Sequence, residues 1–208
     1  MNFLITAGGT REYIDPVRFI SNASSGQMGY ALARAAKKAG HKVTLITAAN
    51  LKPPAGVKVI DVETTAQMFS AVKKNFEKCN CLVMAAAVAD YTPARQAKTK
   101  IKKTTQALTI KLKPTVDILK WASGQKKDKA VIGFALEDKA VRKNAEKKLK
   151  EKNLNMIIAN RISAIGSDKS TVEIKTPAGR WIKIENTPKP TIARKVIKLI
   201  EKEFIQSS

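Results

Sequence analysis

The sequence of 208 residues is 44% hydrophobic and 27% charged, which is typical of a soluble globular protein and excludes a disordered or fibrous chain. No apolar run approaches the ~20 residues of a membrane helix, and the N-terminus lacks the pattern of a signal peptide, so we expect a cytoplasmic protein without membrane contacts. The net charge of +22 favours polyanionic ligands, but aromatic residues make up only 5% and do not accompany the basic segments, so a dedicated nucleic-acid function is not favoured.

Hydrophobic periodicity in the first half of the chain predicts alternating strands and helices. In order these are a strand over 2–6, a helix over 27–39, strands over 41–47 and 57–62, a helix over 64–76, and a strand over 81–85. A polar loop with a glycine turn follows the first strand, and Gly40 ends the first helix. The continuous apolar run at 81–85 is typical of a buried parallel strand.

The second half begins with a long, Lys-rich polar loop over 90–105, of a kind that is more often functional than idle. The remaining expected elements are a strand over 107–112, a helix over 116–123, a strand over 130–134, a basic helix over 139–153, a strand over 154–159, a hairpin of 171–176 and 180–184, and a helix over 190–204. This order predicts one α/β domain over 1–208, with a three-layer, Rossmann-like, mostly parallel sheet and a C-terminal β-hairpin.

Parallel sheets bind ligands at the carboxyl ends of their strands, so the loops after Thr6, Ala85 and Phe134 are expected to meet at one site. The first loop contains Gly8 and Gly9, and the segment before the first helix contains Asn22, Ser24, Ser25 and Gly26. Glycines allow close backbone approach, a helix N-terminus attracts phosphate, and the serines could cap the helix. The alternative is that these residues serve only turns and capping. The spacing is not that of the dinucleotide fingerprint.

The segment at the end of the strand over 81–85 and in the loop after it is Ala85-Ala86-Ala87-Val88-Ala89-Asp90. Its small residues leave room for a flat ligand, and Asp90 could bind Mg²⁺ or a polar group. Tight packing with a capping aspartate is the alternative.

Basic residues mark two further candidate positions. Lysines at 100, 102 and 103 could close over phosphates, or form a solvated charge run. Lys148 and Lys152 lie on one face of a predicted helix, and Phe134 ends a strand where it could stack on a base. Taken alone, these lysines could equally be surface charges.

The histidine and the two cysteines do not indicate a catalytic or metal site. His41, the only histidine, begins a strand and is expected at the edge opposite the site. Cys79 and Cys81 would point to the same face of a strand, and we interpret them as buried thiols because no Cys or His partners complete a metal site.

Together these segments resemble phosphopantothenoylcysteine synthetase, which in most bacteria is the C-terminal half of a bifunctional flavoprotein. The matching stretches, in the family's order, are TAGGTREYIDPVRFISNASSGQMG (6–29), MAAAVADY (84–91), KIKK (100–103), VDIL (116–119), VIGFALE (131–137) and KKLKEKNLNMIIAN (147–160). They extend over nearly the whole chain.

The resemblance implies a homodimeric ligase of coenzyme A biosynthesis that uses CTP and Mg²⁺ to join 4'-phosphopantothenate to L-cysteine through an acyl-cytidylate. It implies that Asn22 serves turnover of this intermediate and that Lys100 serves its formation. The nucleotide contacts it implies are Ala85, Ala86, Ala87, Asp90, Val116, Asp117, Ile118, Leu119, Phe134, Lys148 and Lys152. The chain departs from the family pattern in four places: Asn155 stands in place of Asp, Val116 in place of Pro, GFALED (133–138) in place of the commoner GFAAET, and the usual Asn near Ser170 is absent. We expect these departures to bear on base recognition.

Three other functions are less well matched by the sequence. The flavin-dependent decarboxylase that accompanies this synthetase needs FMN with a catalytic His and Cys. Because the only histidine, His41, is expected at the wrong end of a strand, no FMN is expected here. A separate decarboxylase chain is a candidate partner. A nicotinamide-dependent oxidoreductase lacks its glycine fingerprint, and a nucleic-acid-binding module rests only on the net charge.

Overall fold

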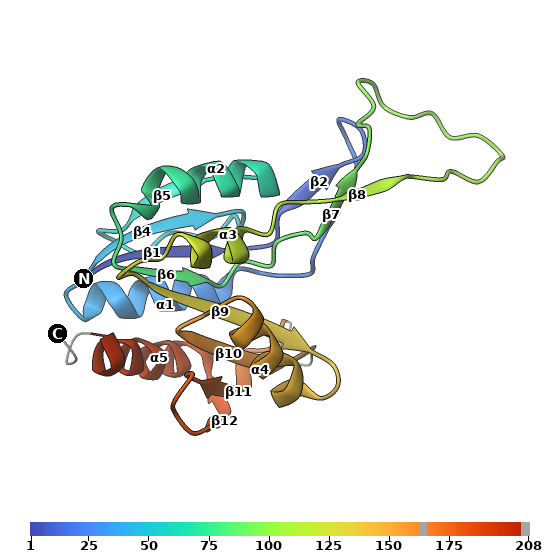
Figure 1. Ribbon diagram of the computed structural model, residues 1–208. Helices are drawn as coiled ribbons and strands as arrows, with labels where there is room; N and C mark the ends of the chain where they lie inside the picture. Colours follow the sequence, from blue (N-terminus) through green and yellow to red (C-terminus); the bar gives the residue numbers. More distant parts are fainter. Residues whose placement is uncertain (163–165, 205–208) are drawn as a thin grey trace.

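The computed structural model describes residues 1–162 and 166–204 and is built on an eight-stranded sheet (Figure 1). Its strands are β1 (Asn2–Ala7), β4 (Lys42–Thr47), β5 (Lys58–Asp61), β6 (Cys81–Met84), β9 (Ala130–Glu137), β10 (Met156–Arg161), β11 (Lys169–Lys175) and β12 (Ile182–Pro188). They lie in the order β12-β11-β10-β9-β6-β1-β4-β5. All neighbours from β10 to β5 pair in parallel, and β11 and β12 add an antiparallel hairpin. The predicted mostly parallel sheet with its C-terminal hairpin is confirmed.

Helices cover both faces of the sheet and complete the three predicted layers (Figure 1). One face packs against α1 (Gln27–Lys38) and α5 (Lys189–Phe204), and the other against α2 (Thr65–Phe76), α3 (Ile118–Gly124) and α4 (Val141–Glu151). Each helix turns a stripe of apolar residues to the sheet, as its periodicity predicts. Side chains on the two faces therefore form two separate apolar cores.

The strand order reverses at β1, which creates the crevice in which such sheets hold ligands. The chain runs from β1 outward to β4 and β5, then returns to place β6 on the other side of β1. Hydrogen bonds join the loops after β1 and β6: the Ala86 amide donates to Thr6 Oγ1 at 3.1 Å, and the Ala87 amide donates to the Gly8 carbonyl at 2.9 Å. These bonds fix the two loops side by side at the carboxyl edge.

Two small antiparallel sheets project from this edge and form what we call the arm, residues 11–21 and 91–114 (Figure 1). One sheet pairs β2 (Arg11–Tyr13) with β3 (Phe19–Ser21), and the other pairs β7 (Tyr91–Pro93) with β8 (Leu112–Pro114). The sequence predicted only loops at β2, β3 and β7. The predicted strand at 107–112 is wrong, because residues 107–111 are irregular and β8 begins only at Leu112. Leu108 is 60% exposed, so its alternating pattern has no core to face.

The reactive residues outside the site are structural. His41 Nε2 lies 2.8 Å from Glu201 Oε1, at the edge opposite the strand ends, as predicted. Both cysteines are buried, but they face opposite cores: Cys81 packs on the side of α1 and Cys79 on the side of α2. The expectation of a shared face is wrong because Cys79 precedes β6 and does not follow its alternation. No helix among the described residues is long and apolar enough to cross a membrane.

Candidate active site

A cavity of about 510 Å³ lies at the carboxyl edge of the sheet, beside the strand-order reversal. Its walls come from the segment before α1, the loop after β6, the start of α3, and the ends of β9 and α4. The predicted site residues that line it are Asn22, Ser24, Ser25, Gly26, Ala85, Ala86, Ala87, Asp90, Val116, Asp117, Ile118, Leu119, Phe134, Lys148 and Lys152. Segments far apart in the sequence therefore converge as the topology predicts.

The N-terminus of α1 opens into this cavity without a side-chain cap. The predicted capping by Ser24 or Ser25 is wrong, because Gly26 occupies the cap position with φ of 77°. A Cβ at Gly26 would lie 2.6 Å from Ala49 Cβ, so the tight approach of Ala49 also demands glycine there. The Gln27 amide donates to Ser25 Oγ at 3.5 Å. The following amides of the first turn remain available to an anion, and the helix dipole adds a partial positive charge.

Asn22 links the segment before α1 to the loop after β6. Its Nδ2 donates to the carbonyl oxygens of Ala87 at 3.3 Å and Val88 at 3.0 Å. Gly9 makes this arrangement possible, since a Cβ there would lie 2.5 Å from the Asn22 carbonyl oxygen. Gly8 and Gly9 are not among the described residues that line the cavity, so they shape the loop from behind.

The wall formed by α3 and α4 carries two lysines, Lys148 and Lys152, and the carboxylate of Asp117. Lys152 Nζ lies 2.7 Å from Asp117 Oδ2, and Asp117 also caps α3 by accepting from the Lys120 amide. Burial alone would raise the pKa of Asp117, but these hydrogen bonds and the charge of Lys152 bring that pKa below its ordinary value. Burial, reinforced by the charge of Lys152, lowers the pKa of Lys148. An entering phosphate would relieve this cost and favour the charged ammonium.

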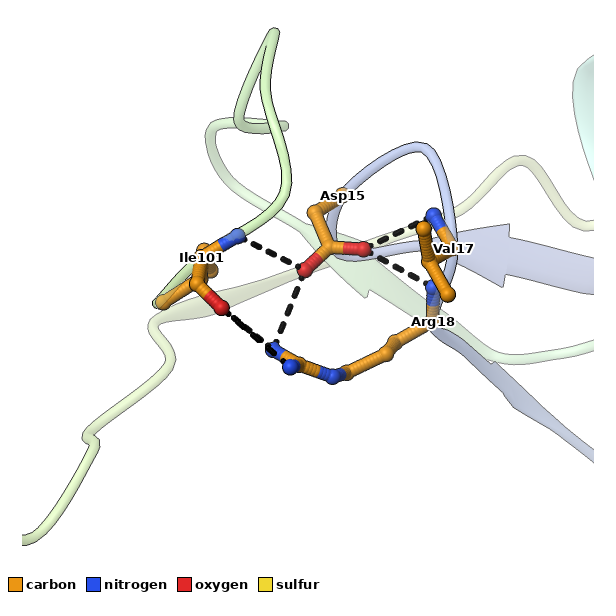
Figure 2. Close-up of polar contacts among 4 residues, drawn as sticks. All are labelled: Asp15, Val17, Arg18 and Ile101. Carbon is orange, nitrogen blue, oxygen red and sulfur yellow. Dashed lines mark hydrogen bonds and ion pairs between the residues drawn. The ribbon is translucent and has the colours of Figure 1, made fainter. Parts of the chain in front are cut away.

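Lys100 is the predicted catalytic residue that the structure does not bring to the cavity. It is exposed on the arm and is not among the described residues that line the cavity. The next residue, Ile101, is held by a cluster that Figure 2 shows: Asp15 Oδ2 accepts from the Ile101 amide at 3.2 Å, and the Arg18 guanidinium donates to the Ile101 carbonyl at 3.2 Å. The arm thereby fixes the main chain beside Lys100.

Asp15 is the centre of this cluster and is completely buried (Figure 2). Its Oδ1 accepts from the amides of Val17 and Arg18 at 2.8 and 2.9 Å, and its Oδ2 pairs with Arg18 Nη1 at 3.1 Å. Burial alone would raise the pKa of Asp15, but the three amide hydrogen bonds and the Arg18 charge bring that pKa below its ordinary value of 3.8. The ionised carboxylate is therefore the form that holds the arm together.

Replacing Asp15 by Asn is expected to loosen the arm at neutral pH. The amide oxygen can still accept from Val17, but the amide nitrogen would face the Ile101 N–H and the Arg18 guanidinium, so donors would oppose donors. Trypsin should then cut after the neighbouring lysines of the arm faster in Asp15→Asn than in Asp138→Asn, a control variant with the same substitution at an exposed position. Equal cleavage of both variants would show that Asp15 does not hold this segment.

The same carboxylate makes the wild-type arm sensitive to acid. Because the folded pKa is depressed, the stabilisation by Asp15 is fully present above about pH 3.8 and is lost as pH falls through the lower, folded value. Hydrogen exchange at the Ile101 amide should accelerate over that acid window in the wild type relative to other arm amides. In Asp15→Asn this pH dependence should disappear.

Of the departures from the expected pattern, Val116 and Leu136 line the cavity, as does Ser170. The expectation that Asn155 bears on base recognition is not supported by its position: Asn155 precedes β10, at the opposite edge, where its Oδ1 accepts from the Val131 amide at 3.0 Å. Sequence analysis also missed three polar residues on the wall nearest α5, namely Asn160, Ser170 and Lys189; Gln27, at the start of α1, lies on the same wall.

The cavity can hold a magnesium ion only if a bound ligand supplies some of the oxygen atoms that coordinate the ion. No group of three or more His, Cys, Asp or Glu side chains suited to a metal occurs within 1–162 and 166–204. Asp90 and Asp117 line the cavity, but Asp117 is already paired with Lys152. Mg²⁺ is commonly held by one or two carboxylates together with substrate phosphates, and Asp90 fits that role.

Residues 1–204 match the family described as the DNA/pantothenate metabolism flavoprotein C-terminal domain. The chain belongs to this family. A solved structure of the C-terminal domain of coenzyme A biosynthesis bifunctional protein CoaBC superposes with a TM-score of 0.87 at 38% identity, covering 100% of this chain and 96% of that one. The structure of the DNA/pantothenate metabolism flavoprotein from Streptococcus pneumoniae gives a TM-score of 0.85 at 25% identity, covering 97% of this chain and 99% of that one.

Among full-length relatives, the coenzyme A biosynthesis bifunctional protein CoaBC of Bacillus subtilis is 45% identical over 166 residues, which cover 79% of this chain and 41% of the relative. The CoaBC protein of Borreliella burgdorferi is 39% identical over 204 residues, which cover 95% of this chain and 51% of the relative. The chain thus spans about half the length of these two relatives.

Proposed function

We propose that the chain is a phosphopantothenate–cysteine ligase of coenzyme A biosynthesis, acting in the cytoplasm with CTP and Mg²⁺. The observation that carries the proposal is the convergence, around one cavity, of the implied nucleotide contacts with the open N-terminus of α1. Family membership and the names of the CoaBC relatives support a role in pantothenate metabolism and coenzyme A biosynthesis. The lysines of the cavity and the open N-terminus of α1 suit a substrate that carries several phosphates.

The proposed reaction has two steps and uses no protein nucleophile. A carboxylate oxygen of 4'-phosphopantothenate attacks the α-phosphorus of CTP, the bond to the bridging oxygen breaks, and pyrophosphate leaves with that electron pair. The amine of L-cysteine then attacks the acyl carbon, CMP leaves with the electrons of the C–O bond, and the amine loses a proton. The protein supplies positioning and charge neutralisation, which can provide most of the catalysis in such transfers.

The residues divide between the parts of the nucleotide. Phe134 and the small side chains of 85–87 offer apolar walls for the base, while Lys148 and Lys152 supply positive charge. The α1 N-terminus faces the phosphates, and Asp90 would hold Mg²⁺ with them. Bound Mg²⁺ would supply further neutralisation of phosphate charge.

Pyrophosphate release tests the proposal directly. The purified protein would be given 4'-phosphopantothenate with CTP or with ATP, each with and without cysteine. We expect CTP to support release in a single burst without cysteine and continuous turnover with it. Release that does not depend on phosphopantothenate would contradict the ligase assignment, and equal turnover with ATP would contradict the choice of CTP.

We further propose that two copies associate through the arm. Exposed apolar side chains gather on it, among them Phe19, Tyr91 and Leu108, at 43%, 55% and 60% exposure. A protruding surface of this kind is typical of a protein-binding site. Sedimentation should give a homodimer, and a Leu108→Ser, Tyr91→Ser double variant should shift it toward monomer. A separate decarboxylase chain remains a candidate partner of the assembly.

A further inference from the structure

Lys189, the first residue of α5, is a buried lysine on the cavity wall that faces α1. It is 8% exposed although it carries an ammonium group. Its main chain is fixed by a hydrogen bond from its amide to the Asp168 carbonyl at 3.2 Å. Burying an ammonium group is costly unless it is paired with an opposite charge, so this position calls for an anionic partner.

The surroundings of Lys189 provide only neutral acceptors. Its Nζ donates to Gln27 Oε1 at 3.1 Å and to the Ser167 carbonyl. No carboxylate within the described residues lies within ion-pair distance of it, although the charge of Asp168 acts on it from farther away. An ammonium has three protons to donate, and these two acceptors leave one for a ligand. Burial lowers the pKa of Lys189, a cost that a bound anion would offset.

A second polar group at the same wall also lacks a partner. Ser170 on β11 is 5% exposed and lines the cavity, yet its Oγ makes no hydrogen bond within the described part of the chain. Buried hydroxyls are nearly always bonded in native proteins, so an unbonded one beside a cavity is placed to bond a ligand. Gln27 is the first residue of α1, so the uncapped helix N-terminus lies next to the Lys189 ammonium. Three features that favour an anion therefore meet at this wall.

The position of this wall decides which part of a nucleotide reaches it. Of the implied nucleotide contacts, Phe134 lies on β9, two strands away from β11, and packs on the same face of the sheet as α5, whereas the start of α3 packs on the opposite face. A nucleotide bound there would extend across the α1 N-terminus with its phosphates toward Lys189. This assignment rests on the proposed function, in which the terminal two phosphates leave together.

We propose that Lys189, Gln27 and Ser170 form a subsite for the β- and γ-phosphates of the nucleotide, which also holds the pyrophosphate leaving group. Lys189 neutralises the charge, Gln27 positions the ammonium through its side-chain oxygen, and the Ser170 hydroxyl donates to a phosphate oxygen. The subsite contributes to every ligand that contains two linked terminal phosphates and contributes nothing to a nucleoside monophosphate.

Calorimetric titration with inorganic pyrophosphate, CTP and CMP at physiological salt tests the subsite. Lys189→Gln removes the ammonium, and Gln27→Glu places a carboxylate on the ammonium, where it competes with phosphate. Each should weaken binding of pyrophosphate and CTP by about tenfold to a hundredfold, as expected for a lost charge-assisted contact. CMP binding should stay within about twofold, a change of under about 0.4 kcal/mol. Lys195→Gln, on the exposed side of α5, makes the same change in net charge and should change nothing.

Gln27→Glu keeps the test decisive if Lys189→Gln folds poorly. Gln27 is exposed, and a carboxylate in the first turn of α1 favours the helix, so this variant should melt at or above the wild-type temperature. The proposal is overturned if both folded variants bind pyrophosphate as Lys195→Gln does, if CMP binding falls in parallel with CTP binding, or if the wild type binds no pyrophosphate. Lys189-dependent binding of pyrophosphate without binding of CTP would instead uphold the subsite and contradict the proposed nucleotide.

Discussion

Replacing Lys100 by Gln is expected to abolish pyrophosphate release while leaving the protein folded. The side chain is exposed and makes no hydrogen bond or ion pair with the described residues, so its loss should change the unfolding free energy by no more than about 0.5 kcal/mol. In the proposed first step its ammonium neutralises charge that develops on the phosphates. The loss of one such contact commonly costs about a hundredfold or more in rate.

Lys100 can act only if the arm brings it to a cavity, because the structure places it outside the cavity of its own chain. Asp15 and Arg18 hold the adjacent Ile101, so Lys100 should move with the arm rather than independently. Lys102→Gln is the matched control, since it removes the same charge two residues away on the same exposed loop. Wild-type rates in Lys100→Gln, or an equal loss in both variants, would contradict a specific role for Lys100.

The sheet and its helices could be predicted because burial imposes a period on the sequence. Helix α2 illustrates this, since Met68, Val72 and Phe76 recur at four-residue spacing and all face one core. The strands of the arm are three residues each, and only Glu12 and Pro93 in them are buried, so no period can be recognised in them. The predicted strand at 107–112 is wrong for a related reason: its alternating apolar residues have no core to pack against.

The cavity could be predicted in outline because the carboxyl ends of parallel strands must meet at one edge. That rule also applies to Asn160 near the end of β10, so this residue could have been found by carrying the argument one strand further. Lys189 could not have been predicted as a site residue, because a lysine beside Pro190 at the start of a helix is typical of an exposed surface position. Its burial depends on α5 packing against α1, which is a tertiary contact without a local signal. The Ser24 and Ser25 capping prediction failed for a similar reason: Ala49, which excludes a Cβ at Gly26, lies beyond β4.

Replacing Asn22 by Asp should separate the two half-reactions. Asn22 Nδ2 donates to the carbonyls of Ala87 and Val88, so the amide is expected to give up at least one of these bonds when it donates to substrate. In the second step such a donor would stabilise the negative charge that develops on the acyl oxygen as the cysteine amine attacks. An aspartate there only accepts, and it would repel both that charge and the two carbonyls. The step should slow by roughly a hundredfold to a thousandfold.

The first step concerns the α-phosphate and depends more on Lys100, so Asn22→Asp should still form the acyl-cytidylate. Rapid quench with labelled CTP should show a burst of about one pyrophosphate per site followed by slow turnover. Asn22→Ala is the matched variant, because it removes the donors without adding a charge against the carbonyls. If Asn22 only shapes the loop before α1, both variants should loosen that loop, lose CTP affinity to a matching extent and accumulate no intermediate. A stalled intermediate in both, with CTP affinity retained, would place the Asn22 amide in the second step and would make its bonds to Ala87 and Val88 the resting state of a catalytic donor.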